Sequence, residues 1–157
     1  MPPEETPVVV ITGASMGIGR ALTLRYASDG ARLAIQARDR VALEKVQREA
    51  TKAGGVCITE AGDATNAGDC ARLINRAKTE FGRIDVLINN AGRGYYAGVN
   101  DIDLAELADL FSLNVVAPLR LTQLAMDELV KSKGVVVMMS SIAGVAAAPK
   151  MGAYAAT

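Results

Sequence analysis

The segment from Thr12 to Gly19 reads Thr-Gly-Ala-Ser-Met-Gly-Ile-Gly and directly follows the apolar run Val8–Ile11. A buried strand that passes through glycines into a helix is typical of a phosphate-binding loop, because glycine lets the backbone turn tightly and approach an anion closely. A helix beginning at Gly17 would point unpaired N–H groups and its positive dipole end at the phosphate. An ordinary tight turn is the alternative interpretation. The residues expected at the phosphate are Thr12, Gly13, Ser15, Met16, Gly17, Ile18 and Gly19.

The glycine spacing in this loop is G-x-x-x-G-x-G. It differs from the G-x-G-x-x-G of the commonest dinucleotide-binding pattern. It is not a P-loop either, because no Gly-Lys-Ser/Thr follows. The loop alone therefore indicates a phosphate ligand without deciding which one.

Polar residues or glycines also follow each of the other expected strands. In open parallel sheets the ligand lies outside the carboxyl ends of the strands, so these residues would line one crevice. Any one of them alone is explained by turn chemistry, whereas all of them together favour a binding site. They are Arg38 and Asp39, Asp63, Asn89-Asn90-Ala91-Gly92, and Ser140 with Ser141.

Strand-like and helix-like patterns alternate along the whole chain. Such alternation predicts βαβ units and an α/β fold of the Rossmann type, a doubly wound parallel sheet between two helix layers. Strands are expected at Val8–Ile11, Leu33–Ala37, Val56–Thr59, Ile84–Ile88 and Val135–Met139. Helices are expected from Gly17 to about Ser28, around Val41–Ala50, over Cys70–Phe81 and in a last turn at Gly152–Thr157.

A long helix is expected from about Asp103 to Lys131. Proline lacks a backbone N–H, so Pro118 should bend this helix or open its hydrogen-bond ladder. The apolar residues expected on one face are Leu104, Leu107, Ala108, Phe111 and Val115.

Composition excludes several classes of protein. The 157 residues form one domain, and 17 basic residues balance 17 acidic ones, so there is no basic field for nucleic acid or anionic lipid. The absence of histidine excludes a Ser-His-Asp triad and the usual zinc sites, and no metal site is expected. Cys57 and Cys70 indicate a reducing compartment, and the polar residues 1–7 indicate a disordered tail rather than a targeting signal. No apolar run is long enough to span a membrane, and we expect a cytoplasmic protein.

The motifs together resemble the short-chain dehydrogenase/reductase family. They are Thr12-x6-Gly19, Asn89-Asn90-Ala91-Gly92, Asn114, Ser141 and Tyr154, in the family's order and at its intervals from about Val8 onward. The resemblance implies an oxidoreductase that moves a hydride between a nicotinamide cofactor and a small carbonyl or secondary alcohol.

The resemblance also implies roles for single residues. Tyr154 would be the acid–base, and Ser141 would hydrogen-bond and polarise the substrate oxygen. Asn114 would hold a water in the proton relay, with a polar residue in a helix opened by Pro118 as the alternative. Asp63, with Ala64 beside it, would meet the adenine. The floor next to the ribose would be Asn90, Ala91 and Gly92.

The choice of cofactor depends on the end of the second strand. In the family an acid that closes this strand selects NAD, and Ala37 stands at that position. Arg38 would instead meet a 2′-phosphate with a planar guanidinium, and Asp39 would cap the next helix. We therefore expect NADP(H), although Asp39 could bind the ribose and favour NAD(H).

The chain departs from the family at its end. The family has Tyr-x-x-x-Lys, and the sequence given stops at Thr157, one position before that lysine. The expectation is a C-terminally truncated member, a homodimer or homotetramer when full length, with the last strand, Val135–Met139, exposed as a sheet edge. The alternative is a non-catalytic dinucleotide-binding fragment or a pseudoenzyme without the lysine.

Overall fold

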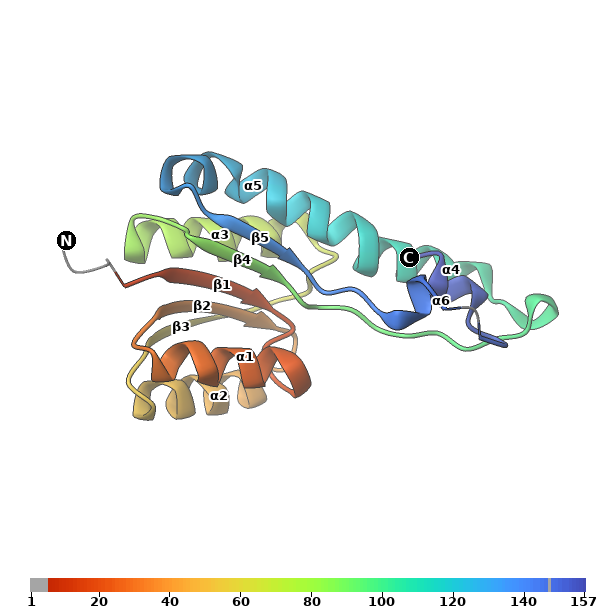
Figure 1. Ribbon diagram of the computed structural model, residues 1–157, viewed down its shortest axis with the longest axis horizontal. Coiled ribbons are helices and arrows are strands. Elements are labelled where there is room, and N and C mark those ends of the chain that lie inside the picture. Colours follow the sequence, from red (N-terminus) through yellow and green to blue (C-terminus); the bar gives the residue numbers. More distant parts are fainter. Residues whose placement is uncertain (1–5, 147) are drawn as a thin grey trace.

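A five-stranded parallel sheet organises the computed structural model, which describes residues 6–146 and 148–157 (Figure 1). The strand order is β3-β2-β1-β4-β5, so β1 has β2 on one side and β4 on the other. The strands are β1 (Val8–Thr12), β2 (Arg32–Ala37), β3 (Val56–Ala61), β4 (Val86–Asn89) and β5 (Val135–Met138). This is the expected Rossmann-like α/β fold, and its order reverses at β1, where such sheets open a crevice for ligand.

Helices cover both faces of the sheet. Figure 1 shows α1 and α2 on one side and α3 and α5 on the other. The main helices are α1 (Gly17–Ser28), α2 (Arg40–Lys52), α3 (Ala67–Phe81), α4 (Leu104–Phe111) and α5 (Ala117–Ser132), and short turns are η1 (Val99–Asp101), η3 (Ile142–Gly144) and α6 (Gly152–Ala155).

Alternate residues of the strands belong to two buried clusters, one on each face of the sheet. Ile11 and Ile35 pack toward α1 and α2, which contribute Ala27, Leu43, Val46 and Ala50. Val10, Ala34 and Leu87 pack toward α3 and α5, which contribute Cys70, Leu73, Ile74, Ala77, Leu121, Ala125 and Leu129. The central strands are thus covered on both sides, as a parallel sheet requires.

The structure confirms the expected elements, with small shifts at their ends. Helix α1 ends at Ser28 and α3 ends before Gly82, which takes the left-handed conformation that glycine favours there. Strand β3 runs two residues further than expected, to Ala61, and β4 begins two residues later, at Val86. The expected tail, residues 1–7, lies mostly outside the described residues, although the carbonyls of Thr6 and Pro7 both accept hydrogen bonds from Arg32.

The long helix is opened directly before its proline. A π-helical segment, η2 (Ser112–Val116), separates α4 from α5, and Pro118 follows within two residues. The expected apolar face is wrong for α4, because Leu104 and Phe111 are exposed and Leu110 is the buried residue. Helix α4 lies beyond the carboxyl ends of the strands, so those side chains have no strand to pack against (Figure 1).

Both cysteines are buried and unpaired. Burial raises the pKa of the Cys57 thiol to about 12 and also raises the pKa of Cys70. Within residues 6–146 and 148–157, no helix has the length and apolarity needed to cross a bilayer.

Candidate functional site

Two glycines of the Thr12–Gly19 loop are required by close backbone contacts. A Cβ on Gly13 would lie 2.9 Å from the Cα of Ala91, and Gly13 has a φ of +65°. A Cβ on Gly19 would lie 2.3 Å from the carbonyl oxygen of Gly13. The first glycine therefore lets the loop cross the end of β4, and the third lets α1 pack against the loop.

The middle glycine faces open space. Gly17 has a φ of +54°, and a Cβ there would meet nothing within 4 Å. The first α1 amide with an acceptor is that of Arg20, which donates to the carbonyl of Met16. In the described structure the N–H groups of Gly17, Ile18 and Gly19 have no hydrogen-bond acceptor. Free amides at a helix start beside an open glycine are suited to an anion.

Thr12 and Asn90 join the ends of β1 and β4. The Thr12 hydroxyl oxygen accepts from the backbone N–H groups of Asn90 and Ala91, each at 3.1 Å. The Asn90 amide donates to the carbonyls of Thr12 and Gly13 at 2.9 and 3.2 Å. Thr12 is almost fully buried, so it supports the loop from beneath rather than lining the crevice.

At the end of β2, the two residues considered for contact with the cofactor ribose, Arg38 and Asp39, have different contacts. Asp39 caps α2, since its carboxylate accepts from the backbone N–H of Ala42 at 3.0 Å. Ala37 is the last residue of β2 and is buried. Arg38 is exposed, and within the described residues its guanidinium has neither a hydrogen-bond nor an ion-pair partner.

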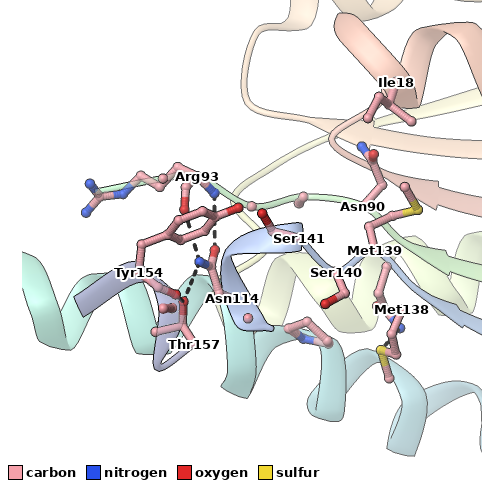
Figure 2. A pocket seen from close by; sticks show the side chains of 17 residues that line it. Ile18, Asn90, Arg93, Asn114, Met138, Met139, Ser140, Ser141, Tyr154 and Thr157 are labelled. Atoms are coloured by element: carbon pink, nitrogen blue, oxygen red, sulfur yellow. Dashed lines mark hydrogen bonds between the residues drawn. The ribbon is translucent and has the colours of Figure 1, made fainter. Parts of the chain in front are cut away.

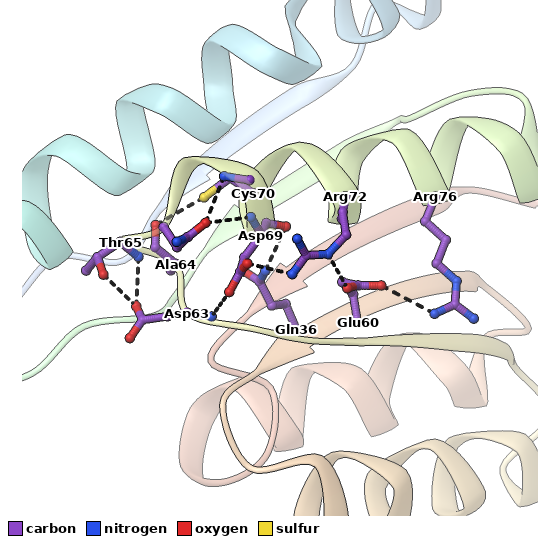
Figure 3. A network of polar contacts seen from close by, with 11 residues as sticks. Gln36, Glu60, Asp63, Ala64, Thr65, Asp69, Cys70, Arg72 and Arg76 are labelled. Carbon is purple, nitrogen blue, oxygen red and sulfur yellow. Dashed lines mark hydrogen bonds and ion pairs between the residues drawn. The ribbon is translucent and has the colours of Figure 1, made fainter.

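The loop Gly62–Asn66, between β3 and α3, presents an acceptor next to a donor (Figure 3). One carboxylate oxygen of Asp63 accepts from the backbone and the hydroxyl of Thr65, both at 2.8 Å. The other oxygen of Asp63 and the backbone N–H of Ala64 have no partner in the described part of the chain. Arg120 of α5 holds the loop by donating to the carbonyl of Thr65.

On the far side of β1, a pocket of about 300 Å³ opens between the ends of β4 and β5. Ser141 and Tyr154 line it together, and Figure 2 shows the Tyr154 ring reaching toward Ser141. The Ser141 oxygen accepts from the backbone N–H of Ala143, which leaves its own hydroxyl proton free to be donated. The predicted residues that also line this pocket are Ile18, Asn90, Ala91, Gly92 and Asn114.

Asn114 lies in the π-helical segment, and both its side-chain oxygen and its amide nitrogen are hydrogen-bonded. Its oxygen accepts from the N–H of Arg93 at 3.1 Å, and its amide donates to the carbonyl of Arg93 and the hydroxyl of Thr157, at 3.0 and 2.9 Å (Figure 2). The amide thus fixes the strand-like segment after β4. Its expected role in holding a relay water stays a prediction.

Several contributing residues were not predicted from the sequence. Arg120 and Asp69 hold the Gly62–Asn66 loop, and Met138 and Met139 line the pocket. An acid in the first turn of a helix is a visible signal for Asp69, but nothing in the sequence marks Arg120 as a contact of a distant loop.

In the described residues, no group of three or more cysteine, aspartate or glutamate side chains could hold a metal ion. The residues described above offer the crevice hydroxyl groups, amides, one free carboxylate oxygen and an exposed guanidinium.

Comparisons with known proteins agree on one family. The family model for short chain dehydrogenase matches residues 7–157. The chain is similar to 11-beta-hydroxysteroid dehydrogenase 1A of Arabidopsis thaliana, with 38% identity over 152 residues. The matched residues make up 96% of this chain but only 44% of the length of that relative.

Two solved structures extend the likeness to the fold. An alcohol dehydrogenase from the archaeon Thermococcus sibiricus, complexed with 5-hydroxy-NADP, has a TM-score of 0.93 at 29% identity, covering 97% of this chain and 65% of that one. An NAD+-bound xylitol dehydrogenase has a TM-score of 0.91 at 29% identity, and the match covers 98% of this chain and 60% of that one.

Proposed function

The chain belongs to the short-chain dehydrogenase family, and we propose that it binds NADP(H) and serves hydride transfer to or from a small carbonyl or secondary alcohol. The observation that carries this proposal is the pairing at the Gly62–Asn66 loop of a free Asp63 oxygen with the free N–H of Ala64. Adenine presents an N6 amine donor next to an N1 acceptor. The free Asp63 oxygen could accept from the N6 amine, and the Ala64 N–H could donate to N1. The unpaired amides at Gly17–Gly19 would meet the pyrophosphate.

The preference for NADP(H) rests on Arg38. Asp39 caps α2 through one of its carboxylate oxygens, so its side chain already has a structural role at the helix start. The free guanidinium of Arg38 follows directly on β2, where a 2′-phosphate would lie, and guanidinium binds phosphate with two parallel hydrogen bonds. Among similar structures, both NADP-type and NAD+ complexes occur, so the preference needs its own test.

Replacing Arg38 with aspartate tests this preference. In Arg38→Asp, the affinity for NADPH should fall by about 10- to 100-fold, because charged hydrogen bonds are lost, while affinity for NADH changes by less than about threefold. Arg48→Asp makes the same charge change on an exposed residue of α2 and should alter neither affinity. Equal losses for both cofactors, or no loss of NADPH affinity, would refute the assignment.

Proton transfer is assigned to Tyr154 and polarisation to Ser141. The bound nicotinamide supplies or accepts the hydride. The Tyr154 hydroxyl gives its proton to the substrate oxygen during reduction, and the Ser141 hydroxyl donates a hydrogen bond to the same oxygen. Both side chains line the pocket between β4 and β5, beside the segment that Asn114 fixes.

NADPH oxidation with a panel of small ketones and diketones tests this assignment. Tyr154→Phe should lower the rate by at least about 100-fold, the usual worth of a general acid, while NADPH still binds. Equal rates in the two proteins would contradict the role of Tyr154. Background rates in both, with NADPH still bound, would favour the non-catalytic dinucleotide-binding alternative.

A further inference from the structure

Asp69 fixes the backbone of the loop that faces the proposed adenine site. One of its carboxylate oxygens accepts from the backbone N–H of Asp63 at 2.7 Å (Figure 3). Asp69 lies in the first turn of α3, and its own N–H is bound by the capping residue Asn66. The carboxylate is therefore carried by a rigid helix start and reaches back to the loop between β3 and α3.

The surroundings of Asp69 are built around this contact. A Cβ on Gly62 would lie 2.8 Å from both the Cβ and a carboxylate oxygen of Asp69, so only glycine permits the approach. Gln36 donates to the carbonyl of Asp69, and Arg72 pairs with its second carboxylate oxygen. The N–H of Asp63, and to a smaller extent Arg72, hold the pKa of Asp69 below its ordinary value, so the acceptor is ionised at neutral pH.

This contact decides which groups the loop offers to a base. With the N–H of Asp63 bound to Asp69, the loop presents one acceptor, the free oxygen of Asp63, and one donor, the N–H of Ala64. Without Asp69, the loop would present a second donor directly beside that acceptor. Adenine, with its N6 amine and its N1 acceptor, needs a protein acceptor opposite position 6 and a donor opposite N1. Hypoxanthine, with O6 and N1–H, needs a donor opposite position 6 and an acceptor opposite N1.

We propose that Asp69 is a positioning residue that makes the Gly62–Asn66 loop selective for adenine over hypoxanthine in the cofactor. The inference rests on the proposed function, since it assumes that the loop meets the adenine of a bound dinucleotide. Asp69 does not touch the base itself. It acts by binding the N–H of Asp63 and so fixing the direction of the Asp63 carboxylate and the Ala64 N–H.

The test compares dissociation constants for NADPH and its hypoxanthine analogue, deamino-NADPH, in the wild-type chain and in Asp69→Ala. The wild type should prefer NADPH by about tenfold or more, the worth of one well-placed hydrogen bond to a charged group. Asp69→Ala should lose on the order of tenfold in NADPH affinity and less than about twofold for the analogue. The ratio of the two constants is the readout that general loosening of the fold would not move.

Three further variants separate positioning from stability. Gly62→Ala displaces the Asp69 carboxylate by an independent route and should lower the ratio in the same way. Asp69→Asn keeps an oxygen that can accept from Asp63 and should restore most of the ratio. Glu60→Gln weakens the other ion pair of Arg72 without touching the Asp63 contact and should leave the ratio unchanged.

The outcomes distinguish this inference from the proposed function. Equal losses for both cofactors in Asp69→Ala and in Gly62→Ala would overturn the inference, as would an unchanged ratio in both. If Asp69→Ala does not fold, judged by circular dichroism, Gly62→Ala decides alone. A wild-type chain that binds neither cofactor would instead remove the proposed function, whereas a wild type that binds both equally would refute only the adenine selectivity.

Discussion

The centre of the sheet and its β5 edge are built differently. Strand β1 is buried at every residue, and β2 is buried at all but Arg32, because helices cover both faces and strands lie on both sides. Strand β5 pairs only with β4 in the described structure, and Val135 and Met138 at its ends are about half exposed. The first region is a buried core, whereas the second is an edge next to the pocket that Ser141 and Tyr154 line.

This difference shows how each region holds its site. Around β1 the Thr12–Gly19 loop makes close backbone contacts at Gly13 and Gly19, and the side chains of Thr12 and Asn90 add hydrogen bonds to them. Around the pocket between β4 and β5, the segment after β4 is held by side-chain hydrogen bonds of Asn114 to Arg93, and Asn114 also bonds Thr157. A change in the first region should therefore cost stability and binding together, whereas a change in the second should spare stability.

The same glycine-to-alanine change in both regions gives the largest expected contrast. Gly19→Ala should lower the free energy of unfolding by about 3 kcal/mol, the upper end of the overpacking range, because the obstacle 2.3 Å away is a backbone carbonyl. Gly144→Ala, whose Cβ would meet nothing within 4 Å, should stay within about 0.5 kcal/mol of wild type. Urea unfolding followed by circular dichroism measures both. Similar losses in the two variants would show that the regions are equally tightly packed.

The fold could be predicted because its signals are local. Alternating apolar runs and helical stripes gave all five strands and the helices, and Gly82 ended α3 as expected. The opening of the long helix followed from the missing N–H of Pro118 alone. The capping role of Asp39 was also predicted correctly, since an aspartate directly before a helical stripe has few other uses.

The failures of prediction have a common physical cause. Periodicity predicts which residues share a face of α4 but not whether anything packs on that face, so Leu104 was expected in an apolar face and is exposed. The contacts of Arg120 with Thr65 and of Asn114 with Arg93 join residues far apart in sequence, and only the packed fold brings them together. The roles of Ser141 and Tyr154 in catalysis stay predictions, because a pocket shows placement and not turnover.

A matched pair of valines extends the comparison to ordinary packing. Val10 of β1 is fully buried and Val135 of β5 is 56% exposed, so the same substitution removes the same atoms from two environments. Val10→Ala should lower the free energy of unfolding by about 2 kcal/mol, from lost burial plus a cavity, and Val135→Ala by less than about 1 kcal/mol. Both changes in the free energy of unfolding are obtained from the midpoints of urea unfolding, provided that the slope of free energy against urea concentration stays constant. A loss at Val135 as large as that at Val10 would mean that the β5 edge is covered in solution, for example by a second copy of the chain, and the contrast between the two regions would then belong to the isolated chain alone.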